Sequence, residues 1–185
     1  MPAVPELVQL PKRIAVLPSR TMTEAPSKTK VLMAKAVVAL MIALVVLGLA
    51  WYGFSADVRE RIWRQLLARP GGPMTFRFLL QPCMAALAAL RDGIRDARTG
   101  RAPYFSTLVS DAKSRDGLLG EGLVATARVL LLGLVMDMVY QAVELNSFYP
   151  AEAVIVALVL AFLPYVLLRG PIARIARLWV GAAGR

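Results

Sequence analysis

Residues 36–54 form an unbroken run of nineteen residues without a charged side chain. As an α-helix this run is about 28 Å long, which matches the roughly 30 Å hydrocarbon core of a bilayer. Trp51, Tyr52 and Phe54 at its end suit the aromatic belt found at membrane surfaces. The apolar run and the leader before it are both too long for a secretory signal peptide. We therefore expect a transmembrane helix here.

The composition of the whole chain agrees with a membrane protein. Of its 185 residues, 58% are hydrophobic and 18% are charged, against about 25% charged residues in soluble domains. A single Cys excludes a disulfide scaffold, and the absence of His excludes His-based metal sites and acid–base chemistry. Among its apolar neighbours, Cys83 is expected to serve packing.

We predict an all-α integral membrane protein with about four hydrophobic helices, three of them certain spans, and additional interfacial amphipathic helices. The predicted regions are a disordered basic tail over 1–30, a transmembrane helix and an interfacial helix within 31–73, and a membrane core over 74–179. Within the core we expect a helix over 74–98, a polar loop over 99–117, a transmembrane hairpin over 118–169 and an interfacial helix over 171–179.

Residues 76–94 are the ambiguous segment. Their uncharged stretch, 78–90, has only thirteen residues, a length more typical of a buried or re-entrant helix. Arg77 and Arg91 bracket it and can extend toward the membrane surfaces, which lengthens the usable span. Small residues recur at every fourth position from Ala85, a pattern that lets another helix approach closely. We favour a short crossing helix over a re-entrant one.

The distribution of basic residues indicates the orientation. The loop over 144–152 has no Lys or Arg, so it is expected outside, whereas the basic C-terminal tail is expected inside. Two models fit this rule equally well: four crossings with the N-terminus inside, or three crossings with it outside. We prefer four crossings because no signal assists export of the basic tail.

Charged side chains at bilayer depth cost about 2.5–3.5 kcal/mol on insertion scales, so each one is a candidate for function. Arg128 and Asp137 lie deepest, nine residues apart and on opposite helix faces. In the four-crossing model Arg77 matches Asp137 in depth and forms an ion pair with it. Arg128 then meets Asp92 or reaches toward Glu121.

These charged pairs are expected mainly to set the register of the helices. A proton or ion path through Asp137, Gln81 and Tyr140 is the functional alternative for the same residues.

Several motifs within residues 74–179 resemble a family of small bacterial integral membrane proteins that has no established activity. The motifs are LQP, RDGIRDARxGRxPYF, DxxYQ, FYPxEA and LPYxLLRGP. The resemblance implies a membrane core with a polar loop and brings no activity to this chain. Members begin near the position of Met74, so the resemblance implies that residues 1–73 are either an additional anchor or the result of a gene start assigned too early.

We expect a non-enzymatic accessory or scaffold subunit in a bacterial cytoplasmic membrane, with both termini cytoplasmic and no cofactor or metal. Its partners are expected to be anionic lipid headgroups, a larger membrane complex or further copies of itself, and not nucleic acid. The alternative is a small oligomeric channel or transporter subunit with a polar path through Asp137. A weaker third option is an enzyme that binds Mg²⁺ through Asp92 and Asp96 beside Arg95. The basic residues expected to bind lipid or a partner are Arg91, Arg95, Arg98, Arg101, Arg169, Arg174 and Arg177.

Overall fold

Helix α1, Lys28–Tyr52, forms because its sequence is dominated by strong helix formers and apolar residues with no internal Pro. Its apolar residues surround the whole helix, and large ones such as Ile42, Val46 and Trp51 remain exposed. A helix that is hydrophobic on all sides is typical of a membrane span. The helix begins at Lys28, so the last residues of the predicted 1–30 tail are helical.

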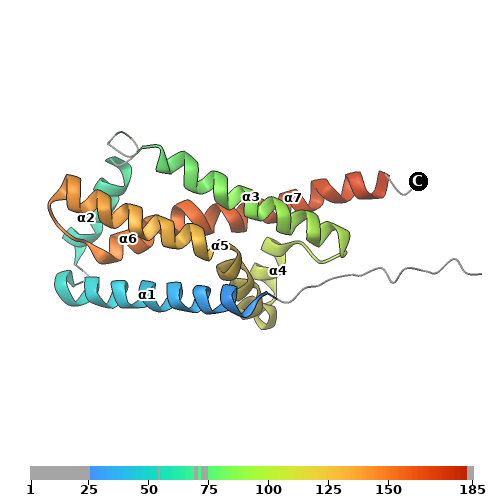
Figure 1. Ribbon diagram of the computed structural model, residues 1–185, viewed down its shortest axis with the longest axis horizontal. Helices are drawn as coiled ribbons and strands as arrows, with labels where there is room; N and C mark the ends of the chain where they lie inside the picture. The colour runs from blue at the N-terminus through green and yellow to red at the C-terminus, as the bar shows by residue number, and fades with distance from the viewer. Residues whose placement is uncertain (1–25, 54, 69–70, 72–74, 183–185) are drawn as a thin grey trace, which may run out of the picture.

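The computed structural model describes residues 26–53, 55–68, 71 and 75–182, and most of the predicted tail lies outside them. The described residues form α-helices and π-helical turns along an elongated bundle (Figure 1). The elements after α1 are α2 (Ala56–Ala68), α3 (Arg77–Arg98), α4 (Tyr104–Ser110), α5 (Ala112–Tyr140), η2 (Gln141–Leu145), α6 (Pro150–Ala157), η3 (Leu158–Phe162) and α7 (Leu163–Ala182).

Within the described residues, three helical segments are long and apolar enough to cross a membrane: Lys28–Tyr52, Ala112–Leu145 and Pro150–Trp179. The all-α prediction is confirmed across the described residues, and these three helices fit a multi-pass membrane protein. Helix α3 is not one of the three. Its 22 residues nevertheless make a helix about 33 Å long.

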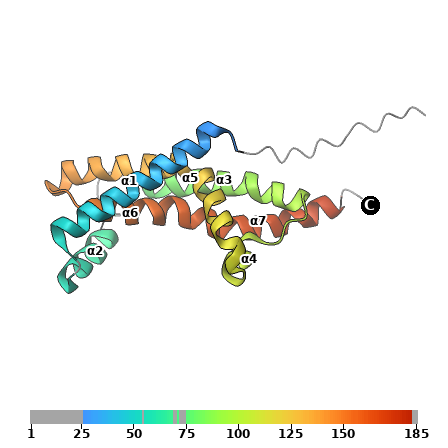
Figure 2. The ribbon, with the colours of Figure 1, turned by 90° about the horizontal axis from the view of Figure 1, so that it is seen from below.

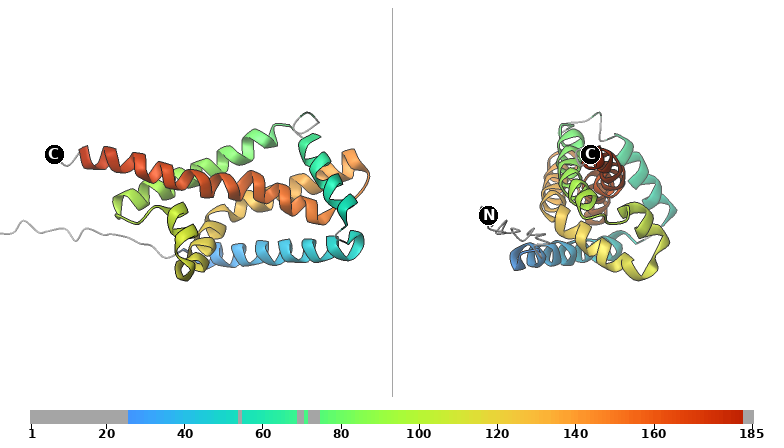
Figure 3. Two further views of the ribbon diagram at one scale, coloured as in Figure 1. Left: turned by 180° about the vertical axis from the view of Figure 1, so that it is seen from behind. Right: turned by 90° about the vertical axis from the view of Figure 1, so that its right-hand side faces the viewer.

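The long helices run back and forth along the bundle (Figures 1 and 3). Helix α3 packs chiefly against α7, while α1 packs against α5 and α6. One apolar core joins α1, α5 and α6, and a second joins α3, α4 and α7. Phe162 packs against both cores and links them.

The two ends of the bundle differ in their elements, and we call them the loop end and the basic end. The loop end holds α2 and residues 146–149; there Arg61 of α2 pairs with Glu152 at 3.3 Å, and the Tyr52 hydroxyl donates to the Phe148 carbonyl at 2.8 Å. The basic end holds the start of α1, the end of α3 and helix α4 (Figure 2). Because α3 starts near the loop end and finishes at the basic end, it runs the length of the bundle and does not turn back (Figure 1).

Two predicted boundaries are wrong. The polar loop over 99–117 is largely helical, because α4 occupies Tyr104–Ser110 and α5 begins at Ala112. Asp111 caps α5 by accepting a hydrogen bond from the Lys113 amide at 3.0 Å, which places the helix start ahead of Leu118.

The predicted boundary between the hairpin, ending at residue 169, and a separate helix over 171–179 is also absent. Residues 171–179 are part of α7, Leu163–Ala182. A proline removes one backbone hydrogen bond from a helix. Helix α7 nevertheless continues past Pro171, where tertiary contacts support it. Arg169 and Ala173 on either side are buried. A Cβ added to Gly93 of α3 would lie 2.7 Å from the side chain of Ile172, which shows how closely α3 and α7 approach here.

Candidate functional site

Six of the eight buried polar side chains that the structure describes gather into two clusters, one toward each end of the bundle. We call them the Arg77 cluster, near the loop end, and the Arg169 cluster, at the basic end. Both central arginines are only 1% exposed. Burial of a guanidinium is costly unless it is paired and hydrogen-bonded, so the partners of each arginine decide what the cluster can do.

In the Arg77 cluster, α3 and α5 meet through an ion pair. Arg77 Nη1 lies 2.9 Å from Asp137 Oδ1, and neither side chain is more than 1% exposed. The guanidinium carbon also lies 4.6 Å from the centre of the Tyr140 ring, within the range of a cation–π contact. The structure thus brings together Arg77 and Asp137, the two residues that were predicted to pair because they lie at the same depth in the membrane.

Gln141 extends this cluster to the hairpin turn. Its amide nitrogen donates to Asp137 Oδ2 at 2.6 Å and to the Tyr149 carbonyl at 3.2 Å. Its amide oxygen accepts from the Tyr149 backbone N–H at 2.6 Å. Sequence analysis did not single out Gln141, although its spacing of four residues from Asp137 places both on one helix face.

Gln81 completes the Arg77 cluster from the next turn of α3. It is 1% exposed, and neither its amide oxygen nor its amide nitrogen has a hydrogen-bond partner within the described residues. A Cβ built on Gly133 of α5 would lie 3.3 Å from that amide oxygen. The predicted polar residues Gln81, Asp137 and Tyr140 are therefore neighbours between α3 and α5.

The Arg169 cluster joins α7, α3 and α5. Arg169 donates to both carboxylate oxygens of Asp96, from Nε at 2.7 Å and from Nη2 at 3.0 Å. Nη2 also donates to Glu121 at 2.7 Å, and Nη1 donates to the Tyr165 hydroxyl at 2.8 Å. That hydroxyl in turn donates to Asp92 at 2.7 Å. Bidentate pairing of this kind is the strongest geometry open to arginine.

Tyr104 covers the Arg169 cluster from α4. Its ring centre lies 4.3 Å from the Arg169 guanidinium carbon, and its hydroxyl donates to the Leu118 carbonyl at 2.6 Å. Burial raises the pKa of Tyr104 to about 12, although the positive charge of Arg169 acts in the opposite direction. The phenol therefore remains a neutral hydrogen-bond donor at ordinary pH.

Arg169 was expected on an exposed basic face, and that placement is wrong. Its position four residues after Tyr165 turns it toward α3, where Asp96 is 2% exposed. Sequence analysis missed Tyr104 and Tyr165, because nothing local in the sequence shows that α4 and α7 enclose the same arginine. The spacing of Tyr165 and Arg169 was the available signal.

The expected partners of Arg128 are also wrong. Asp92 is bound by Tyr165, and Glu121 is bound by Arg169 and by Arg101 at 3.2 Å. Glu121 lies seven residues from Arg128, about 10.5 Å along the helix axis, which is beyond reach of a direct pair.

Arg128 is instead exposed on α5 and makes no hydrogen bond or ion pair within the described residues. Side chains in a helix lean toward its N-terminus. The guanidinium of Arg128 is therefore inclined toward the basic end, as for an arginine that extends toward a membrane surface.

The remaining predicted basic residues divide into two groups. Arg101 pairs with Glu121 and lies 3.6 Å from Asp96, and Arg177 donates to the Arg101 carbonyl. By contrast, the other predicted basic residues are exposed and have no side-chain partner within the described ranges: Arg91, Arg95, Arg98 and Arg174. Cys83 was expected to serve packing, and it is exposed on α3.

The carboxylates at the basic end are poorly placed for metal chemistry. Asp96 is buried against Arg169, and Asp92 accepts from Tyr165, so a cation at this pair would have to displace both contacts. Among the described residues no group of three or more Cys, Asp or Glu side chains is arranged to hold a metal ion. What this arrangement does chemically is neutralise buried charge and connect helices.

Comparison with known proteins adds no relative. No protein-family model matches the chain, and neither the curated proteins nor the solved structures searched include a match.

Proposed function

We propose that this chain is a non-enzymatic integral membrane scaffold or accessory subunit that binds lipid headgroups or a partner through its basic end. The observation that carries the proposal is that, at the basic end, three acidic side chains are bound within the chain whereas several exposed arginines are not. Asp92, Asp96 and Glu121 accept hydrogen bonds from groups of the chain itself. The exposed cations of α3 and α7 have no such partner within the described residues, so they are available to an acidic surface.

The basic end also supports an orientation. Arg91, Arg95 and Arg98 lie in the last turns of α3, and the exposed Lys113 and Arg115 lie at the start of α5. Loops rich in Lys and Arg remain on the cytoplasmic side of a membrane. We place the basic end, and with it both termini, in the cytoplasm of a bacterium whose inner membrane holds the helices.

Co-purification tests the scaffold proposal directly. The full chain would be extracted into native nanodiscs, and the proteins that accompany it would be identified by mass spectrometry. We expect a larger complex of fixed stoichiometry that is lost in an Arg95→Gln/Arg98→Gln variant. A matched variant at the loop end, Arg59→Gln/Arg64→Gln, removes the same charge and should retain the complex. A homo-oligomer without any partner, or equal loss in both variants, would contradict the binding of a partner through the basic end.

A small channel or transporter subunit is the second candidate, and one observation favours it. The buried amide of Gln81, with no hydrogen-bond partner in the described chain, lies beside the Arg77–Asp137 pair. Such a polar group is a feature of an ion or proton path across a membrane. Flux through reconstituted vesicles distinguishes the candidates: Asp137→Asn in a conductor leaves the fold intact and abolishes flux, whereas in a scaffold it lowers stability or assembly.

A further inference from the structure

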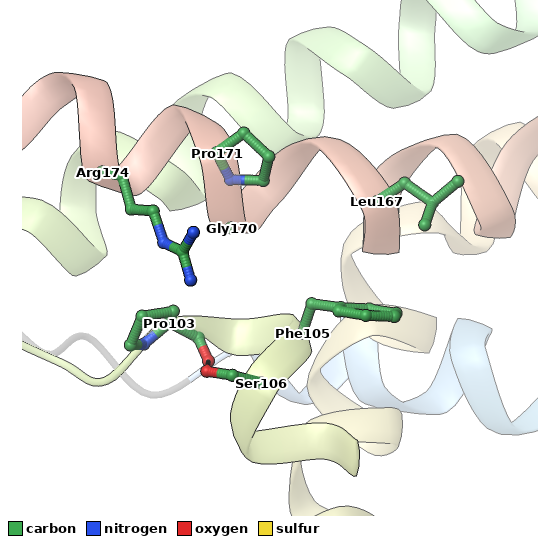
Figure 4. A pocket seen from close by; sticks show the side chains of 7 residues that line it. All are labelled: Pro103, Phe105, Ser106, Leu167, Gly170, Pro171 and Arg174. Atoms are coloured by element: carbon green, nitrogen blue, oxygen red, sulfur yellow. Dashed lines mark hydrogen bonds between the residues drawn. The ribbon is translucent and has the colours of Figure 1, made fainter. Parts of the chain in front are cut away.

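A groove separates α4 from α7 at the basic end (Figure 4). Its volume is about 150 Å³. The residues that shape it are Pro103, Phe105 and Ser106 on one side and Leu167, Pro171 and Arg174 on the other. No acidic side chain lines it, so its electrostatic character depends on Arg174.

Arg174 is the one lining residue that carries a charge. Its side chain extends from α7 toward α4, with the guanidinium above Pro103 and Ser106 (Figure 4). The neighbouring arginines of α7 are already engaged: Arg169 is buried against Asp96, and Arg177 donates to a backbone carbonyl. Arg174 is exposed and has no partner within the described residues, so its five N–H donors are available.

The apolar part of the groove continues along the surface of α7. Leu163 and Leu167 are each 47% exposed, Pro171 is exposed, and Leu178 is 74% exposed, all on the face that holds Arg174. Phe105 of α4, 45% exposed, faces this stripe across the groove. A cation set within an exposed apolar stripe, on a helix able to cross a membrane, suits the boundary between acyl chains and headgroups.

We propose that the groove holds one anionic phospholipid, with its phosphate on Arg174 and an acyl chain along Leu167 and Phe105. The Ser106 hydroxyl already donates to the Pro103 carbonyl at 2.9 Å, so Arg174 supplies the phosphate contact. An anionic headgroup is favoured because zwitterionic lipids carry their own cation to neutralise the phosphate. This inference deepens the lipid-binding part of the proposed function and depends on the basic end lying at the membrane surface.

Native mass spectrometry of the purified full chain tests the site. The detergent-solubilised protein would be titrated with phosphatidylglycerol or with phosphatidylcholine, and the occupancy of the first bound lipid would be measured. We expect phosphatidylglycerol to bind preferentially, with one lipid retained per chain. Arg174→Gln should weaken that binding about tenfold, the effect of losing one charge-assisted contact.

Two further variants separate a built groove from general surface charge. Arg64→Gln removes an equal charge from the exposed helix α2 at the loop end and should leave the lipid affinity unchanged. Ser106→Trp fills the groove while Arg174 is retained, and it should weaken binding as Arg174→Gln does.

Three results would overturn the proposal. The first is equal loss of binding in Arg64→Gln and Arg174→Gln, and the second is undiminished binding in Ser106→Trp. The third is competition by inorganic phosphate at concentrations comparable to those of the lipid, which would assign Arg174 to a free anion. None of these results depends on co-purification of a partner protein, so the lipid site and the scaffold proposal fail separately.

Discussion

At the scale of single residues, two buried arginines clamp the two ends of α3. Arg77 at the start of α3 pairs with Asp137 of α5, whereas Asp96 near its end binds Arg169 of α7. Each pair can form only at one rotation and one axial position of the helices involved. In an apolar bundle, where almost any helix face can pack, such pairs specify a single arrangement.

Replacing Asp137 by Asn should strongly destabilise the protein. The change leaves Arg77 buried without its counter-charge, and removing one partner of a buried pair costs about 3–5 kcal/mol. Thermal unfolding in detergent, followed by circular dichroism, measures the loss. Glu144→Gln is the control, because Glu144 is exposed near the same end of the helix.

The double variant Arg77→Met/Asp137→Leu removes both charges and should recover much of the lost stability. If Asp137→Asn has the same melting temperature as the Glu144→Gln control, the ion pair does not specify the packing of α3 on α5.

Tyr104 should titrate well above an ordinary tyrosine. Because burial raises its pKa from 10.0 to about 12, the folded protein holds the phenol proton more tightly than the unfolded chain does. The protonated Tyr104 phenol therefore contributes fully to the free energy of unfolding below pH 10, and this contribution is lost as the pH rises toward 12. The difference between the ultraviolet titrations of the wild type and of Tyr104→Phe reports this pKa. A Tyr104 step near pH 10 would mean that α4 does not cover the Arg169 cluster.

At the scale of helices, close packing depends on a few small residues. A Cβ added to Gly48 of α1 would lie 2.6 Å from the Ala151 Cβ of α6 and 2.9 Å from its backbone nitrogen. Backbone atoms cannot yield as a flexible side chain can. Gly48 therefore sets the distance between α1 and the start of the hairpin's second helix.

Two Gly→Ala substitutions should have opposite effects on stability. Gly48→Ala introduces a clash with α6 and should lower the melting temperature. Gly120→Ala on α5 meets no atom within 4 Å and should raise stability by up to about 1 kcal/mol, because Ala is the better helix former. Melting curves of both variants test this, and stabilisation by both would show that α1 does not pack closely on α6.

Two prolines lie within or near the start of α7 without ending it. Helix α7 contains Pro171 and begins just ahead of Pro164. The π-helical turn η3 ends at Phe162, two residues before Pro164, and such turns accommodate a break in the regular hydrogen-bond ladder. The helix continues because its buried residues pack against α3 and α5 on both sides of each proline.

At the scale of the whole molecule, the contacts at the loop end favour four crossings over three, the two topologies that charge distribution leaves open. The Arg61–Glu152 pair and the Tyr52–Phe148 hydrogen bond place α2 beside the hairpin turn. If α1, α5 and the α6–α7 helix cross a membrane, α2 and the turn share one side of it. Helix α3 must then cross as well, to bring the chain back to the basic end.

Cysteine labelling tests this topology. In a Cys83→Ser background, single Ser55→Cys, Ser147→Cys and Ser110→Cys variants place one exposed thiol beside α2, in the hairpin turn and on α4. A membrane-impermeant maleimide added to intact spheroplasts should label the first two, and the third only after lysis. Labelling of Ser147→Cys but not Ser55→Cys from outside would show that α3 does not cross.

Several features of this protein follow from its sequence alone. Apolar runs of membrane-spanning length predict α1 and the hairpin helices, because burial of a helix in an apolar medium depends on local composition. The juxtaposition of Arg77 and Asp137 follows from matching depths, since an unpaired charge inside a bundle is too costly to retain. The basic character of one end requires only a count of Lys and Arg.

Only the tertiary structure decided which charges are buried. Arg169 and its partner Asp96 are 73 residues apart, and their contact depends on how α3 and α7 rotate about their own axes. Arg128 is exposed, and not paired with Asp92 or Glu121, for the same reason. The passage of α7 through Pro171 likewise depends on contacts with α3. Helical rotation and axial register are set by packing among all the helices at once, so no local pattern in the sequence encodes them.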